Sequence, residues 1–259
     1  MRIADKFREL KAKNEKALIA YVCAGDPSSE DTGKYVHALV KGGADIVELG
    51  LPFSDPVADG PTIQAASDRS LEAGMNPDVY FELAASIKEQ VPLVCMTYYN
   101  LIFRRGVETF VKDCAASGIT GIIVPDLPIE EADDILKACK AHGVDMIFMV
   151  TPVTDRDRMQ KIFSKGSGFL YIVSRLGVTG ARADVARSTK EILEKVNTTL
   201  PRAVGFGISN GKQAAEVIAA GADAVIVGSA FVNIIASQDN VEERLEQLSE
   251  ELKAGCSGQ

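Results

Sequence analysis

The sequence is poor in the residues on which metal and histidine chemistry depend. Its 259 residues contain no tryptophan and only two histidines, His37 and His142, and both fall in segments with helical periodicity. Because neither histidine lies near an acidic cluster in the sequence, the spacing predicts neither a metal site nor a catalytic triad built on histidine.

The cysteines and the apolar runs limit the cellular compartment. Five cysteines stand singly, without CxxC spacing, and their odd number argues against a framework of disulfide bonds (Cys23, Cys95, Cys114, Cys139 and Cys256). No apolar run reaches the roughly 20 residues that cross a bilayer, and the charged start of the chain lacks the apolar middle of a secretion signal. We therefore expect a protein of the cytoplasm or of an equivalent reducing compartment.

Positive charge is also scarce, since the formal net charge is -8 at pH 7. Nucleic acids and anionic membranes both require a basic face, so neither is expected as a partner. If a phosphate group binds to this chain, backbone amides must hold it.

Short apolar, β-branched runs, in contrast, are abundant. Eight of them occur, and segments with helical periodicity separate them (17–23, 45–50, 92–98, 121–126, 145–150, 169–174, 202–207 and 223–228). Near-continuous apolar strands of this length suit a parallel sheet that is buried on both faces. Several of the helical segments end in glycine, the residue that accepts the left-handed conformation at a helix end (Gly43, Gly118, Gly143 and Gly221).

These eight units fit a single-domain (β/α)8 TIM barrel of the α/β class, for which about 250 residues is the usual size. The charged amphipathic start of the chain predicts an extra N-terminal helix, and the segment after the eighth run predicts a short extra helix. A doubly wound open sheet is the structural alternative. No linker or low-complexity segment divides the chain, so residues 1–259 are assigned to one domain.

In such a barrel the active site lies at the carboxyl ends of the strands. Carboxylates collect after the second to fourth runs, together with other polar residues (Glu48, Asp55, Asp59, Tyr98, Asn100, Pro125 and Asp126). Glycines collect after the sixth to eighth runs, where Tyr171, Ser174 and Arg175 also lie.

Glu48 interrupts an apolar run, and alternation points it away from its neighbours Val47 and Leu49. Inside a barrel, burial would raise its pKa toward neutrality, which suits a group that both gives and takes a proton. The alternatives are a solvated glutamate or a buried glutamate in an ion pair. For Asp55 and Asp59, the alternative to a role in the site is that they only form turns beside Pro52 and Pro56.

The glycine side has the features of a phosphate site. Its three loops contain Gly177 and Gly180, then Gly205 and Gly207, then Gly228 followed by Ser229. The last loop opens the segment SAFVNIIA, and a helix N-terminus offers unpaired N–H groups and a partial positive charge. The loops after strands seven and eight, with a short extra helix, form the usual phosphate position of barrels. The alternative for each glycine is that it only allows a tight turn and binds no phosphate.

The stretch VELGLPFSDPVADGPTIQAAS resembles the signature of the tryptophan synthase alpha subunit family. Other stretches agree with that family in order: AYVCAGDP, MTYYN, GIIVPDLPIEE, YIVSRLGVTGAR, GFGIS and VIVGSAFV. The resemblance extends from about Phe7 to about Leu252.

The resemblance implies a retro-aldol cleavage of indole-3-glycerol phosphate to indole and glyceraldehyde 3-phosphate, without a cofactor. It implies that Glu48 both donates the proton to indole C3 and accepts the proton of the side-chain hydroxyl. It also implies that Asp59 stabilises the charge developing at the indole N–H and that Tyr171 assists at the reacting side chain. The implied phosphate cradle consists of Gly180, Gly207, Gly228 and Ser229. The implied indole pocket and lid consist of Tyr21, Phe206, Tyr98, Thr179 and Arg175.

The resemblance also implies a protein partner, the tryptophan synthase beta subunit, in an alpha2-beta2 complex that receives indole through a tunnel. The loops expected to face this partner carry Asp55, Pro52, Asn100, Asp126 and Pro128. No lysine occurs in the eight apolar runs, which argues against a Schiff-base aldolase. The histidine positions argue against a metal-dependent aldolase.

Three features depart from the family pattern near the predicted mouth: Tyr99, Leu176 and the polar segment TPVTDRDR. They bear on the shape of the pocket and on its lid more than on the chemistry. Three alternative hypotheses are another phosphate-handling barrel enzyme, a stand-alone lyase and a catalytically silent barrel subunit. The first of these would lack the pair Glu48 and Asp59.

Overall fold

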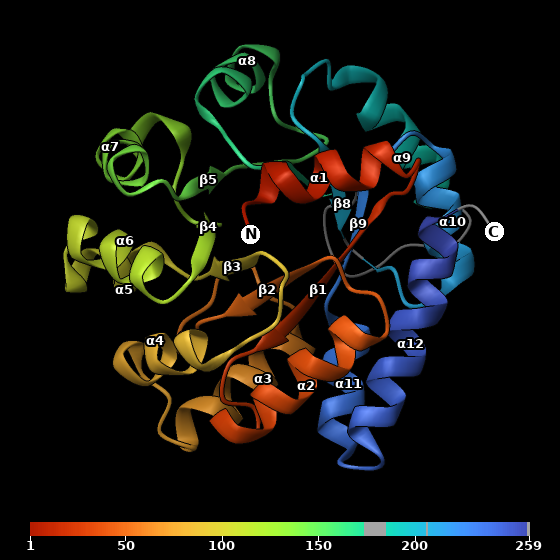
Figure 1. Ribbon diagram of the computed structural model, residues 1–259. Coiled ribbons are helices and arrows are strands. Elements are labelled where there is room, and N and C mark those ends of the chain that lie inside the picture. The colour runs from red at the N-terminus through yellow and green to blue at the C-terminus, as the bar shows by residue number, and fades with distance from the viewer. Residues whose placement is uncertain (174–184, 206, 258–259) are drawn as a thin grey trace.

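The computed structural model describes residues 1–173, 185–205 and 207–257 (Figure 1). Its strands are β1 (Ala17–Cys23), β2 (Ile46–Gly50), β3 (Leu93–Met96), β4 (Ile119–Ile123), β5 (Asp145–Ile147), β6 (Met149–Val150), β7 (Leu170–Val173), β8 (Arg202–Gly205) and β9 (Ala224–Val227). Its α-helices are α1 (Ile3–Ala12), α2 (Ser29–Lys41), α3 (Pro61–Glu72), α4 (Pro77–Ser86), α5 (Tyr99–Arg105), α6 (Val107–Ala116), α7 (Asp133–His142), α8 (Arg156–Lys165), α9 (Val185–Lys195), α10 (Gly211–Ala219), α11 (Ser229–Ser237) and α12 (Val241–Cys256). A 3-10 helix, η1 (Ile129–Glu131), precedes α7.

All the strand pairs are parallel, and the sheet has the order β5-β4-β3-β2-β1-β9-β8-β7-β6. Its two ends, β5 and β6, are two halves of one apolar run that only Phe148 separates. The sheet therefore closes on itself, and the predicted (β/α)8 barrel is confirmed. The sequence predicted eight strands; the break at Phe148 makes the fifth of them two short strands, each pairing with a different neighbour.

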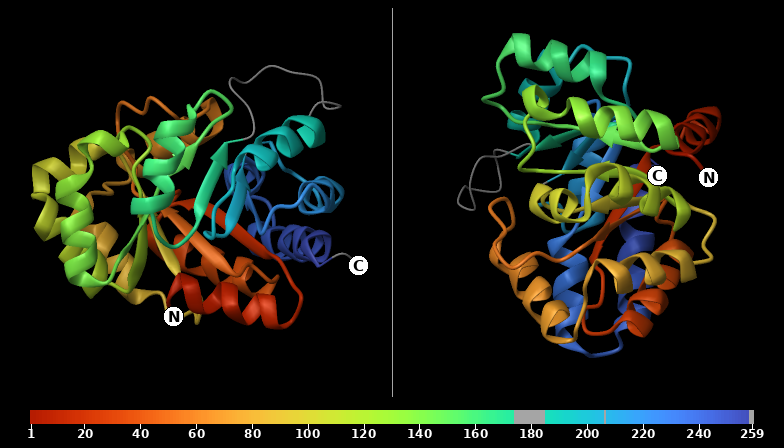
Figure 2. Two further views of the ribbon diagram at one scale, coloured as in Figure 1. Left: turned by 90° about the horizontal axis from the view of Figure 1, so that it is seen from above. Right: turned by 90° about the vertical axis from the view of Figure 1, so that its left-hand side faces the viewer.

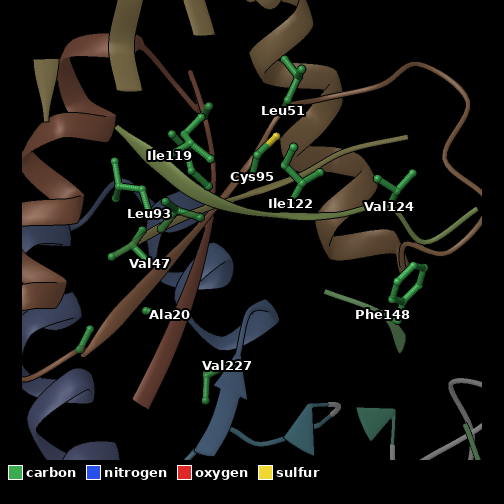
Figure 3. Packing of buried hydrophobic residues seen from close by; sticks show 14 of the residues in the cluster. Ala20, Val47, Leu51, Leu93, Cys95, Ile119, Ile122, Val124, Phe148 and Val227 are labelled. Atoms are coloured by element: carbon green, nitrogen blue, oxygen red, sulfur yellow. The ribbon is translucent and has the colours of Figure 1, made fainter. Parts of the chain in front are cut away.

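Alternation along the strands divides the core into two layers. On β1, Ile19 points into the barrel, where it packs with Ile46 of β2, whereas Leu18 and Ala20 point outward toward the helices. Figure 3 shows part of this outer layer, including Ala20 and Val47. Because Ile46 points inward and Val47 outward, Glu48 points inward.

The helices surround the strands in Figure 1. Ile3 of α1 packs with the inward-facing residues Val94 and Ile147, so α1 covers the amino end of the barrel. Both views of Figure 2 place α1 at the opposite end from the loop between β2 and α3. The predicted N-terminal helix and the predicted short helix after the last strand are present as α1 and α11.

Glycine ends the helices as predicted. The φ angles are 103° at Gly43, 85° at Gly118, 69° at Gly143 and 106° at Gly221. These left-handed conformations let the chain turn directly from each helix into the next strand. Among the described residues, no helix has both the length and the apolar character to cross a membrane.

Candidate active site

A cavity of about 730 Å³ opens at the carboxyl ends of the strands. Residues of the inner face of the barrel form its floor, among them Tyr21, Glu48, Met96 and Tyr171. The loop after β2 contributes Asp59 on one side, and the start of α11 contributes Gly228 and Ser229. The strand ends thus bring residues that are far apart in the sequence to one site.

Glu48 lies on the floor of this cavity and is 1% exposed. Its Oε2 atom has no hydrogen-bond partner in the described part of the chain. Burial, and to a lesser degree the charge of Asp59, raises the pKa of Glu48 to about 8. The solvated alternative for Glu48 is therefore wrong, and its Oε2 atom forms no ion pair with a described residue.

Asp59 lies at the side of the cavity and is fixed at two points. The Tyr98 hydroxyl donates a hydrogen bond of 2.9 Å to Asp59 Oδ2, and Gln64 Nε2 donates one of 2.7 Å to the Asp59 carbonyl oxygen. Burial raises the pKa of Asp59, and the bond from Tyr98 opposes this rise. Asp59 is thus a second carboxyl group in the same cavity as Glu48.

Two tyrosines line the floor, and each lies against a glycine of the neighbouring strand. Tyr21 on β1 stands opposite Glu48 in the strand register, and its ring covers Gly50, where a Cβ atom would be 2.8 Å from Tyr21 Cε2. Tyr171 on β7 covers Gly205 in the same way, with 2.7 Å from that Cβ position to the hydroxyl oxygen. Burial, with the charges of Glu48 and Asp59, raises the pKa of both tyrosines well above 10, so both hydroxyls are donors at neutral pH.

The described glycines of the predicted cradle lie together on the other side of the cavity. Gly207 has a φ of 75°, and Gly228 is the N-cap residue of α11, with Ser229 as the first helical residue. All three line the cavity. The first N–H groups of α11 have no side-chain cap and therefore face an open site.

Several predicted residues lie outside the described part of the chain. They are Ser174, Arg175, Leu176, Gly177, Thr179, Gly180 and Phe206. Among the described residues, no group of three or more His, Cys, Asp or Glu side chains is arranged to hold a metal ion.

The residues predicted to face a partner follow β2, β3 and β4, and all of them lie in loops except Asn100, which is in the first turn of α5. Asp55, Asn100, Asp126 and Pro128 are exposed, whereas Pro52 is buried, so its side chain is not on the surface. Asp126 also accepts a 2.9 Å hydrogen bond from the N–H of Tyr99.

The sequence reasoning missed three exposed apolar side chains at the same end of the barrel. They are Val57 after β2, Phe103 on α5 and Val153 after β6, which are 80%, 68% and 71% exposed. Their signal was available as apolar residues in segments that follow strands, but only the structure shows that they are exposed.

The chain is also similar to known proteins. A family model described as "Tryptophan synthase alpha chain" matches residues 7–257. This chain belongs to the tryptophan synthase alpha chain family. The alpha chain of Methanosarcina barkeri is 63% identical over 254 residues, which cover 98% of this chain and 97% of the relative. Another phosphate-handling barrel enzyme is thereby excluded.

Solved structures of the family have the same fold. The structure of tryptophan synthase subunit alpha from Legionella pneumophila superposes with a TM-score of 0.91 at 33% identity, covering 100% of this chain and 99% of that chain. A tryptophan synthase complex from Pyrococcus furiosus contains a chain with a TM-score of 0.85 at 34% identity, covering 93% and 98%. The function is that of a tryptophan synthase alpha chain, a lyase of tryptophan biosynthesis that cleaves indole-3-glycerol phosphate.

Proposed function

We propose that Glu48, Asp59 and Tyr171 carry out this cleavage and that the released indole passes to a beta subunit. The observation that carries the proposal is the pair of carboxyl groups in one cavity, one of them buried with an unpaired oxygen. A buried carboxyl group without an ion pair is costly, and such groups are concentrated at functional sites.

Glu48 acts first as an acid and then as a base. Indole is a poor carbon leaving group until its C3 atom is protonated, and a pKa of about 8 keeps Glu48 protonated at neutral pH. After Glu48 gives its proton to C3, its carboxylate accepts the proton of the side-chain hydroxyl as the C–C bond breaks. The hydroxyl becomes the aldehyde, the bonding electrons return to the indole ring, and Glu48 is again protonated.

Asp59 and Tyr171 act on the charges that develop during this step. Protonation of C3 places positive charge on the indole nitrogen, and the Asp59 carboxylate stabilises that charge by accepting the N–H hydrogen bond. The Tyr171 hydroxyl stays protonated and assists as a donor at the reacting side chain. Tyr21 forms a wall of the indole pocket.

The phosphate group binds at the start of α11, on Gly207, Gly228 and Ser229. The site consists of backbone N–H groups and the positive end of the helix dipole, which suits a chain with a net charge of -8. Replacing Gly228 with Asp is expected to weaken substrate binding through charge repulsion. An unchanged affinity would place the phosphate elsewhere.

A beta subunit is proposed to cover the mouth of the barrel, as in an alpha2-beta2 complex. The support comes from the exposed apolar residues Val57, Phe103 and Val153 beside the polar Asp55 and Asn100. Exposed apolar side chains gathered around a site are typical of protein interfaces.

A steady-state assay tests the proposal. Purified chain is given indole-3-glycerol phosphate, and the aldehyde product is trapped, with and without added beta subunit. Slow cleavage that the partner accelerates is the expected result. Fast cleavage without the partner would point to a stand-alone lyase, and no cleavage in either condition would point to a silent subunit.

Two broader proposals accompany the chemistry. The chain forms one domain over residues 1–259, and it works in the cytoplasm or an equivalent reducing compartment. Buried, unpaired thiols at all five cysteines agree with the second proposal.

A further inference from the structure

Asn233 of α11 lines the same cavity as the proposed phosphate cradle. It lies four residues after Ser229, which is about one helical turn or 6 Å along the axis, so the two residues share a face of the helix. Side chains on a helix lean toward its N-terminus. The amide group of Asn233 therefore leans toward the first turn of α11, where the free N–H groups are.

The side chain of Asn233 is exposed, and no described residue bonds to it. Its amide group offers two N–H donors. The neighbouring Ser209 is different, because its N–H and its hydroxyl both donate to Gln213 Oε1, at 2.8 and 3.1 Å. Ser229 and Asn233 are thus the side-chain donors that remain available on this side of the cavity in the described part of the chain.

The charges in the cavity make such a neutral donor important. The described residues that line it include the carboxyl groups of Glu48 and Asp59 but no lysine or arginine. A phosphate ester carries a charge of about -1.5 to -2 at neutral pH. Among the described lining residues the phosphate therefore meets only neutral donors, and each of them contributes strongly because its acceptor is charged. The buried, unpaired Oε2 atom of Glu48 in the same cavity independently indicates that this cavity holds a ligand.

We propose that Asn233 is a phosphate-binding residue, whose side-chain amide donates a hydrogen bond to an outer phosphate oxygen of the substrate. The inference rests on the proposed function, because it assumes that the phosphate lies at the start of α11. It adds a side chain to a cradle that otherwise consists of backbone groups and Ser229.

Binding measurements on the full chain test the inference without catalysis. The probes are indole-3-propanol phosphate, which keeps the ring and phosphate but lacks the hydroxyl groups needed for cleavage, and free indole, which lacks the phosphate. Asn233→Ala is expected to weaken binding of the phosphate probe about tenfold, the effect of one hydrogen bond to a charged group. Asn233→Asp is expected to weaken it further, since it replaces a donor with a negative charge. Neither change affects the affinity for indole.

Gln238 supplies the matched controls, because it is exposed at the other end of α11. Gln238→Ala and Gln238→Glu make comparable chemical changes at the C-cap of α11, and both are expected to leave binding of the phosphate probe within twofold of the unmodified chain. In turnover, Asn233→Ala is expected to raise KM about tenfold with kcat nearly unchanged.

Two results would overturn the inference. The first is a phosphate-probe affinity within twofold of the unmodified chain for both Asn233 variants, and the second is an equal loss of affinity for the probe and for indole. Either result would leave the proposed function intact, because that function fails on a different observation, normal turnover after Glu48→Gln. If the unmodified chain bound the phosphate probe no better than indole, the cradle and the inference would both be wrong.

Discussion

The Tyr98 hydroxyl lies 2.9 Å from Asp59 Oδ2 and donates a hydrogen bond to it. The Tyr98 hydroxyl oxygen also accepts a hydrogen bond of 3.1 Å from the N–H of Ala58, and the Tyr98 ring packs against Phe53 at a centroid distance of 5.3 Å. The end of β3 therefore holds the loop after β2 in place. Burial raises the pKa of Asp59, and this bond opposes the rise, so Tyr98 favours the ionised form of Asp59.

Replacing Tyr98 with Phe is expected to shift the acidic limb of the pH profile of kcat/KM to higher pH. Loss of the donor removes an interaction that lowers the pKa of Asp59, so Asp59 takes up its proton at a higher pH. Activity at pH 6 should then fall more than activity at pH 8. Tyr35→Phe, at a buried tyrosine of α2 outside the cavity, is the control. An unchanged acidic limb in Tyr98→Phe would show that Asp59 does not set it.

Replacing Glu48 with Gln is expected to reduce kcat by about 10²- to 10⁴-fold or more, the usual contribution of an acid-base group. The amide keeps the shape of the side chain and loses the proton, so binding of indole-3-propanol phosphate should stay near normal. Glu82→Gln, at an exposed position of α4, is the control for replacing a glutamate with glutamine outside the cavity. Turnover close to that of the unmodified chain would remove Glu48 from the mechanism.

The raised pKa of Glu48 also predicts how stability depends on pH. Between its ordinary pKa of 4.5 and its folded-state value of about 8, the folded chain holds a proton that the unfolded chain has released. The stability linked to this proton is present below pH 4.5 and is lost as the pH rises through 8. Glu48→Gln should therefore be more stable than the unmodified chain at pH 9 by up to a few kcal/mol, since each pKa unit corresponds to about 1.4 kcal/mol.

Urea unfolding of both proteins at pH 5, 7 and 9 measures this difference. The gain from Glu48→Gln should be small at pH 5 and increase toward pH 9. A difference that does not change with pH would mean that Glu48 has an ordinary pKa in the folded chain.

Much of this site could be predicted from the sequence because strand alternation and chain order fix it. Glu48 follows Ile46 and Val47, so the period of two places it inside the barrel. The rule that strand ends form the site then brings Glu48, Asp59 and Tyr171 together, although Tyr171 lies 123 positions after Glu48 in the sequence.

Other features depend on contacts that no local pattern encodes. The break at Phe148 arises because the two halves of one run pair with β4 and β7. In the sequence, Gln64 looks like an ordinary polar residue in the first turns of a helix, and nothing indicates its hydrogen bond to Asp59. Asn233 likewise resembles a surface residue until the closed barrel shows that its helix face lines a cavity.

Gly50 is expected to tolerate no larger residue, because the ring of Tyr21 occupies the space of its missing side chain. Gly50→Ala should push Tyr21 into the cavity and cost about 1–3 kcal/mol of stability, the usual effect of overpacking. Catalytic activity should also fall, because the displaced Tyr21 ring enters the cavity. Gly33→Ala is the control, since Gly33 lies in α2 with no atom within 4 Å of its Cβ position and should gain stability from the better helix former.

A double variant shows whether the loss acts through Tyr21. The Tyr21 hydroxyl is the atom nearest to the new methyl group, so Gly50→Ala combined with Tyr21→Phe should recover part of the lost stability. Additive effects of the two substitutions, measured by urea unfolding, would contradict the steric explanation.

Lys253 of α12 is expected to be a major source of stability at the amino end of the barrel. Its Nζ donates hydrogen bonds of 2.8 Å to Asp45 and 3.1 Å to the carbonyl oxygen of Lys16. Asp45 is buried and also accepts the N–H of Leu18. Lys253→Met would leave this carboxylate buried without its cation, which costs about 3 kcal/mol. Lys41→Met is the control, because it breaks the exposed pair of Lys41 with Glu246 on the same helix and should change stability little.

The cost of Lys253→Met should also decrease on acidification. Burial raises the pKa of Asp45, whereas Lys253 lowers it. Without Lys253 the pKa of Asp45 rises further, so Asp45 becomes neutral at a higher pH and no longer needs a cation. Urea unfolding at pH 5 and at pH 8 should therefore give a smaller difference between the variant and the unmodified chain at pH 5. An equal cost at both values would mean that Lys253 stabilises through the packing of its side chain rather than through the charge of Asp45.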